Sequence, residues 1–234
     1  MEYIHNTEQF QFHNTVVALG KFDGMHKGHQ LIFDELIQYK QLGYQAAVFS
    51  FDRPPLNMLK HKHMRVIYTT NEKIKLLARR GIDIYIEHPF TDEFSHLSPE
   101  DFVIKVLLEK TGMKVLVVGD DCGFGYKRQG NVELLERMSK EYDFKLIVIP
   151  KLELEGEIVS STRIRHLLSE GKVEEANRLM EDPFMICGSV VHGNHMGAEV
   201  LQMPTANQIP LEDKLLPPNG VYVSRIHYKD ETYY

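Results

Sequence analysis

The sequence predicts an α/β fold built on a parallel β-sheet, followed by a small β-rich piece. Two patterns in the first two thirds of the 234 residues support this. Short apolar runs rich in β-branched residues alternate with segments whose apolar residues recur at helical spacing. Strands separated by helices of this length form right-handed βαβ units. From about Phe184 the helical pattern fades, and strand-like runs are joined by a stretch with glycine and proline.

Five runs have the composition of buried strands, and a helical pattern lies between each pair. The strands are expected at Thr15–Leu19, Gln45–Phe51, Ile82–Ile86, Lys114–Val118 and Phe144–Ile149. The first helix is expected to end at Gly43 and to carry Ile32, Phe33, Leu36 and Ile37 on one face. Three further helices are expected from Asn71 to Gly81, from Ser98 to about Lys110, and from Asn131 to Tyr142. Ser98 suits an N-cap and Pro99 a first helical position. Ligands bind at the carboxyl ends of strands in such sheets, so the loops there are the informative ones.

The β-rich piece is too small to bury a sizeable core alone. Its strands are expected at Phe184–Val191 and Val221–Ile226. We therefore divide the chain into a first domain, residues 1–183, and a dependent β module, residues 184–234. We hypothesise that the module covers an apolar patch of the first domain or of a partner subunit.

The composition excludes several classes of protein. Apolar residues are 43% and charged residues 26%, as in ordinary globular chains, and the net charge of −6 argues against a general nucleic-acid or anionic-membrane binder. No apolar run approaches the roughly 18 to 20 residues of a membrane helix, and the polar stretch Met1–Phe12 has no signal-peptide core. Cys122 and Cys187 lie far apart without metal-like spacing. We expect a cytoplasmic protein with no resident metal.

The loop after the first strand carries the clearest chemical signal. It runs from Gly20 to His29 and leads into a helix, whose free N–H groups and dipole favour an anion. His26 and His29 are three residues apart and share a helix face, and Gly28 has no side chain to keep a phosphate from the backbone. Two imidazoles here can donate hydrogen bonds to a polyphosphate. A turn with two solvated histidines, or a pair of metal ligands, is the alternative.

Two later segments also lie at a strand end or a helix start. Val118–Gly125 is a glycine-rich loop with two acids, followed by the basic residues Lys127 and Arg128. Taken alone it could hold a cation or form a surface turn. Val159–Arg165 places three hydroxyl residues beside two arginines. Hydroxyls cap helices and arginines bind phosphate oxygens, so the segment suits either plain capping or phosphate binding.

Together these segments resemble the nucleotidyltransferase superfamily, and in particular the bacterial riboflavin kinase/FAD synthetase family. The family has motifs similar to Phe22–His29, Val118–Gly125 and Ser160–Arg165, in the same order. The resemblance covers about Val16–Met180. It implies a Rossmann-like nucleotidyltransferase domain that transfers an adenylyl group from ATP, with Mg²⁺, to FMN and so forms FAD and pyrophosphate.

The resemblance also implies roles for individual residues. The implied catalytic residues are His26, His29 and Arg165. The implied ATP-binding residues are Gly20, Phe22, Asp23, Gly24, Gly28, Gly119, Asp121, Ser161 and Thr162. The residues implied near the flavin phosphate are Arg53, Lys127 and Arg128. After the second strand the family has a histidine where this sequence has Pro54, and the neighbouring Arg53, or His61 or His63, could supply a charge instead.

The C-terminal piece resembles the family's kinase module less well. Pro204–Asn207 is similar to the Mg-ATP motif of that module, but the preceding Gly-Arg pair of the family is Ala198–Glu199 here, and a glycine is replaced by Gln202. The sequence also ends at Tyr234, before the strand that supplies the family's catalytic glutamate. A kinase acting on a hydroxyl needs a base. We expect a truncated, incomplete β-barrel-like module with no working riboflavin kinase.

The sequence therefore predicts an FMN adenylyltransferase with ATP and FMN as its partners, and neither a membrane nor nucleic acid among them. Two alternatives stay open. One is an adenylyltransferase for another phosphate acceptor, and the other is a flavin-sensing or RNA-interacting regulator on the same fold.

Overall fold

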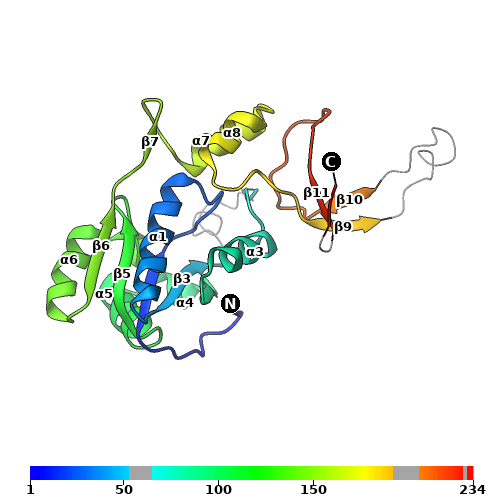
Figure 1. Ribbon diagram of the computed structural model, residues 1–234. Helices are drawn as coiled ribbons and strands as arrows, with labels where there is room; N and C mark the ends of the chain where they lie inside the picture. The colour runs from blue at the N-terminus through cyan, green and yellow to red at the C-terminus, as the bar shows by residue number, and fades with distance from the viewer. Residues whose placement is uncertain (53–64, 192–205, 229–230, 234) are drawn as a thin grey trace, which may run out of the picture.

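A six-stranded parallel sheet forms the centre of the first domain in the computed structural model, which describes residues 1–52, 65–191, 206–228 and 231–233 (Figure 1). The strands lie in the order β1-β4-β3-β2-β5-β6, and every neighbouring pair is parallel. Their bounds are β1 (Glu2–His5), β2 (Thr15–Leu19), β3 (Gln45–Phe51), β4 (Ile84–His88), β5 (Met113–Gly119) and β6 (Lys145–Ile149). The predicted parallel α/β sheet is confirmed, while β1 gave no signal because it is short and polar at both ends.

Helices cover both faces of this sheet. Their bounds are α1 (Lys27–Gln41), α3 (Thr70–Arg80), α4 (Asp92–Ser95), α5 (Pro99–Asp101), the π-helix η1 (Phe102–Leu108), the 3₁₀ turn η2 (Tyr126–Arg128), α6 (Val132–Glu141), α7 (Ser161–Ser169) and α8 (Val173–Leu179). Alternate residues of β2 face opposite cores. Val16 and Ala18 belong to the core beneath α1, α3, α7 and α8, and Val17 and Leu19 to the core beneath η1 and α6.

The helix ends obey the local signals in the sequence. The Oγ of Ser98 accepts a hydrogen bond from the Asp101 amide at 3.1 Å, as an N-cap does. Gly81 ends α3 in the left-handed conformation at φ 87°, which favours glycine. Thr69 and Glu72 form a capping box at the start of that helix. These contacts fix where α3 begins, close to the loop that follows β2.

The β-rich piece forms separate two-stranded antiparallel pairs within the described residues. β9 (Gly188–Val191) pairs with β10 (Asn207–Pro210), and β11 (Ile226–Tyr228) pairs with β12 (Glu231–Tyr233). Both pairs project beyond α3 (Figure 1).

Two strand predictions need correction there. Only the last four residues of Phe184–Val191 form a strand, and the strand expected at Val221–Ile226 begins at Ile226. Val221 and Val223 are fully exposed, so their branched side chains pack against no described strand. A short hairpin of β7 (Glu153–Leu154) and β8 (Glu157–Ile158) also precedes α7.

Candidate active site

The two histidines of the first loop stack against each other at the start of α1. Their ring centroids are 3.6 Å apart with 17° between the planes. His26 is the N-cap residue, and its Nδ1 accepts a hydrogen bond from the His29 amide at 3.3 Å. A Cβ on Gly28 would lie 3.2 Å from that Nδ1. The absence of a side chain at this position therefore makes room for the imidazole of His26.

Burial favours the neutral form of both imidazoles. Burial lowers the pKa of His26 to about 4, although the nearby charge of Asp121 acts in the opposite direction. Burial, and secondly the neighbouring His26, hold the pKa of His29 well below its ordinary value. Since Nδ1 of His26 accepts a hydrogen bond, its proton is on Nε2, and the ring can donate one hydrogen bond to a ligand.

Asp23 joins three segments of the site through its carboxylate. Its Oδ1 accepts hydrogen bonds from the amides of Ile67 at 3.0 Å and Tyr68 at 3.1 Å. Its Oδ2 forms an ion pair with Arg165, which also donates to the carbonyl of Arg65. Within the described residues the carboxylate thus has partners on both oxygens and positions Arg165, and the predicted role of Asp23 in ATP binding stays a prediction.

The start of α7 meets the same loop. The N-cap is Ser160, whose Oγ accepts from the Arg163 amide at 3.2 Å. Ser161 donates to the backbone carbonyl of Asp23 at 2.6 Å, and Thr162 is exposed in the first turn. The N-termini of α1 and α7 are therefore tied to one loop, and both favour an anion.

Phe22 and Gly24 shape the loop from inside. The Phe22 side chain is only 2% exposed and packs against Phe33, with ring centroids 5.0 Å apart. Gly24 adopts a φ of +80°, and a Cβ there would lie 3.0 Å from the side chain of Ile67. The side chain of Phe22 belongs to the core, and its predicted role in ATP binding stays a prediction. In the same loop, a Cβ on Gly20 would meet the Phe22 ring at 2.9 Å.

The loop after β5 brings acids and bases to the same sheet edge. Gly119 ends β5, and the exposed Asp121 pairs with Lys151 at 3.2 Å. Lys127 and Arg128 both have positive φ, at 50° and 58°, a conformation that non-glycine residues adopt at a cost.

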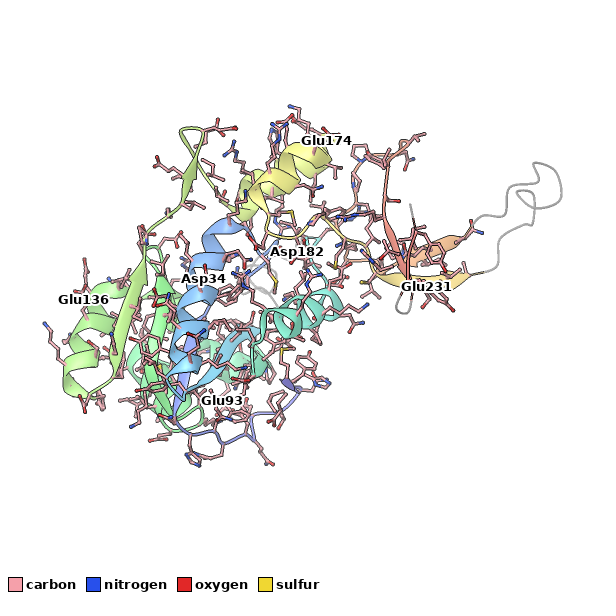
Figure 2. All side chains as sticks on the ribbon, in the orientation of Figure 1. Asp34, Glu93, Glu136, Glu174, Asp182 and Glu231 are labelled. Atoms are coloured by element: carbon pink, nitrogen blue, oxygen red, sulfur yellow. The ribbon has the colours of Figure 1, made fainter. Side chains whose placement is uncertain are left out.

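Lys21 lies in the same loop, directly after Gly20, and is not among the site residues predicted from the sequence. Partial burial and the charge of Arg128 lower its pKa, Asp23 opposes them, and Arg165 lowers it further. The charges of Arg128 and Arg165 therefore act on Lys21. A lysine directly after Gly20, in a loop expected to bind phosphate, was the available signal. Of the six acidic side chains labelled in Figure 2, five lie on different helices or strands, and Asp182 lies in the segment between α8 and β9.

An aromatic cluster lies at the carboxyl ends of β3 and β4. The His88 ring contacts Phe49 and Phe94, with centroids 5.6 Å and 4.3 Å away. Phe51 packs against Phe90 at 5.4 Å and against Phe94 at 5.7 Å. Because the strands are parallel, this cluster and the histidine pair lie along the same edge of the sheet.

Four residues that the sequence analysis named, Arg53, Pro54, His61 and His63, lie outside the described residues.

A hollow of about 800 Å³ lies between α7, α8 and the segment from Val221 to Val223. Neither histidine of the pair lines it.

Comparisons with known proteins identify relatives for both parts of the chain. The family model described as FAD synthetase matches residues 8–163, and the one described as riboflavin kinase matches residues 180–234. Similar proteins named bifunctional riboflavin kinase/FMN adenylyltransferase occur in Buchnera aphidicola from Schizaphis graminum (38% identical, 95% of this chain, 72% of the relative) and in Listeria monocytogenes (35%, 99%, 74%). Another, from Escherichia coli K12, is 32% identical over 95% of this chain and 71% of its own length.

One solved structure is similar over almost the whole chain. It is titled a macrolide-efflux protein from Streptococcus pneumoniae and aligns with a TM-score of 0.86 and 30% identity, covering 99% of this chain and 76% of that one. In the described part of this chain, no helix combines the length and apolar character of a membrane span.

Proposed function

The chain belongs to the bifunctional riboflavin kinase/FMN adenylyltransferase family and is an FMN adenylyltransferase, and we propose that the site around His26, His29 and Arg165 carries out the transfer. An oxygen of the FMN phosphate attacks the α-phosphorus of ATP, and the bond to the leaving pyrophosphate breaks. The attacking oxygen is already anionic, so the reaction needs neither a base nor a covalent enzyme intermediate. The site must align the two phosphates and stabilise the leaving charge.

The observation that carries this proposal is the stacked pair of neutral histidines at the N-terminus of α1. A neutral imidazole can donate a hydrogen bond to a phosphate oxygen, and it avoids the desolvation cost of burying a charged imidazolium. We propose that Lys21, Arg128 and Arg165 supply positive charge to this site, since the charges of Arg128 and Arg165 both lower the pKa of Lys21. We propose that Gly119, Asp121, Ser161 and Thr162 line the nucleotide around them.

We propose that Mg²⁺ enters this site with ATP. The described residues contain no group of three potential His, Cys, Asp or Glu ligands. That agrees with a metal held mainly by phosphate oxygens and water, with one or two carboxylates at most. The exposed carboxylate of Asp121 is suited to such a contact. When bound, the ion would neutralise charge on the phosphates.

For the flavin, we propose that the aromatic cluster at the ends of β3 and β4 contributes apolar surface for the ring system. Phe51, Phe90 and Phe94 are each partly exposed, so a planar ligand could reach them. The predicted contacts of Arg53, Lys127 and Arg128 with the flavin phosphate remain part of this proposal.

We further propose that the second module has no working riboflavin kinase. The match to the riboflavin kinase model shows that such a module is present, and its start at residue 180 supports a boundary near residues 183 and 184. Support for inactivity comes from Ala198–Glu199 and Gln202, which replace residues that suit a phosphate. We also place the protein in the cytoplasm, which agrees with Cys122 and Cys187 being free thiols.

One chromatographic assay tests these proposals. The protein is incubated with ATP and Mg²⁺ and either FMN or riboflavin, and FMN and FAD are quantified. We expect FAD from FMN and no FMN from riboflavin; formation of FMN would disprove the inactive kinase.

His29→Ala should lower kcat by about two orders of magnitude, because it removes a donor to the developing charge. His13→Ala, which changes an exposed histidine, is the matched control. Circular dichroism should show both variants folded. An unchanged kcat in His29→Ala would remove this residue from the mechanism.

A further inference from the structure

A segment of the second module returns to the first domain next to the active site. The amide of Val66 donates to the carbonyl of Asp213, and the amide of Leu215 donates to the carbonyl of Val66, both at 2.7 Å. These two bonds form a parallel bridge between Val66 and Lys214. Lys214 lies in the region that matches the riboflavin kinase model, whereas Val66 lies in the region that matches FAD synthetase.

The ammonium group of Lys214 is fully buried at this junction. It donates to Glu72 Oε2 at 2.7 Å and to the carbonyls of Ile67 and Met185, both at 2.6 Å. Neither side chain of the Lys214–Glu72 pair has any exposed area. An ammonium group has three donors, and all three are used here.

The Glu72 carboxylate connects this buried pair to the start of α3. Its Oε2 also accepts from the amide of Thr69 at 2.8 Å, and its Oε1 accepts from the amide of Cys187 at 2.7 Å. Lys214 therefore holds the segment from Ile67 to Glu72 at both ends, through a backbone carbonyl and through the helix cap.

The opposite side of the same segment holds the active-site loop. The amides of Ile67 and Tyr68 donate to Asp23, and Arg165 bonds to both Asp23 and the carbonyl of Arg65. Ile67 thus accepts from Lys214 through its carbonyl and donates to Asp23 through its amide. A displacement of this segment would move the partners that orient Arg165.

We propose that Lys214 is a positioning residue for adenylyl transfer, supplied by the kinase-like module to the site of the first domain. It acts through the segment from Arg65 to Glu72 and touches no substrate. The inference rests on the proposed site, since it assigns Lys214 an effect on the ATP phosphates through Asp23 and Arg165. It gives the second module a role in forming FAD that is independent of kinase chemistry.

The test compares Lys214→Met with the double variant Lys214→Met/Glu72→Gln. The single variant leaves a buried carboxylate without its partner and can lose stability on that account alone. The double variant removes the charge and keeps an oxygen for the amide of Thr69 or Cys187. Leu135→Ala is the control, because Leu135 is fully buried in the core on the other face of the sheet. Truncation there lowers stability without changing any contact of Arg65–Glu72.

Three readouts are taken at a temperature where each variant is folded: kcat/KM for ATP and for FMN, calorimetric affinity for a non-hydrolysable ATP analogue, and hydrogen exchange of residues 65–72. We expect the double variant to lose about 10- to 100-fold in kcat/KM for ATP, the effect of misplacing a charged group by about 1 Å. Its KM for FMN should stay within about twofold, its analogue affinity should fall, and its exchange should be faster. Leu135→Ala should keep wild-type kinetics.

Wild-type kcat/KM for ATP and wild-type analogue affinity in the double variant would overturn the inference. An equal loss in Leu135→Ala would also overturn it, since general loosening would then explain the effect. If the unmodified protein forms no FAD, the proposed function fails, yet analogue affinity and exchange still decide the role of Lys214.

Discussion

Acidification should destabilise the ligand-free protein through His26 in a predictable pH window. Burial gives this histidine a folded-state pKa of about 4, against an ordinary value near 6.5. Between these values the unfolded chain binds a proton that the folded chain does not, so stability falls as the pH falls. Linkage gives a loss of about 2 kcal/mol from His26 between pH 7 and pH 5. His29, whose pKa is also lowered, adds a loss of the same sign.

The measurement is urea unfolding of the wild type and of His26→Gln at pH 7 and pH 5, with His13→Gln as the exposed control. Glutamine does not titrate, so the variant should lose about 2 kcal/mol less on acidification than the wild type does. Removal of His26 also removes its lowering effect on the pKa of His29, which changes the difference between the two proteins in the same direction. An equal pH dependence for wild type and His26→Gln would refute both the burial argument and the assignment of a neutral imidazole.

Two further predictions concern residues beside the histidine pair. Gly28→Ala should lower kcat about tenfold although alanine favours helices, because its Cβ would lie 3.2 Å from Nδ1 of His26; an unchanged kcat would show that the stack is dispensable. Lys21→Met should raise KM for ATP about tenfold, equivalent to one charged hydrogen bond of roughly 1.5 kcal/mol. The exposed Lys114→Met is its control, and equal effects of the two substitutions would contradict a specific contact.

Most strands of the parallel sheet, several helix ends and the histidine motif could be predicted because their signals are local, whereas β1 carries no such signal. Thr15–Leu19 and Gln45–Phe51 occur with the expected bounds, since each is an apolar run closed by a turn. Ser98 and Gly81 act as caps for reasons that involve only the neighbouring residues. The motif also indicated the family, and the family indicated the reaction.

The contacts that assemble the site could not be predicted from local sequence signals. Asp23 belongs to the motif, yet its partners Ile67 and Arg165 lie 44 and 142 positions away. No local pattern distinguishes a carboxylate that binds a ligand from one that holds an arginine. The same limit explains Phe22, whose aromatic ring fills the core while its neighbours in the loop belong to the proposed anion site.

The buried Lys214–Glu72 pair links the two parts of the chain across the boundary that the sequence predicts. Composition and the family models divide the chain near residues 180 to 184. The buried pair crosses that division: Glu72 belongs to the first domain and has its cationic partner in the second. Removal of the module would leave this carboxylate without the ammonium group that neutralises it, which costs several kcal/mol unless the carboxylate is protonated or rehydrated.

The hypothesis that the module covers an apolar patch of the first domain describes only part of this junction. Phe184, Met185 and Leu215 do pack against the core, but they surround a charge that the first domain cannot satisfy alone.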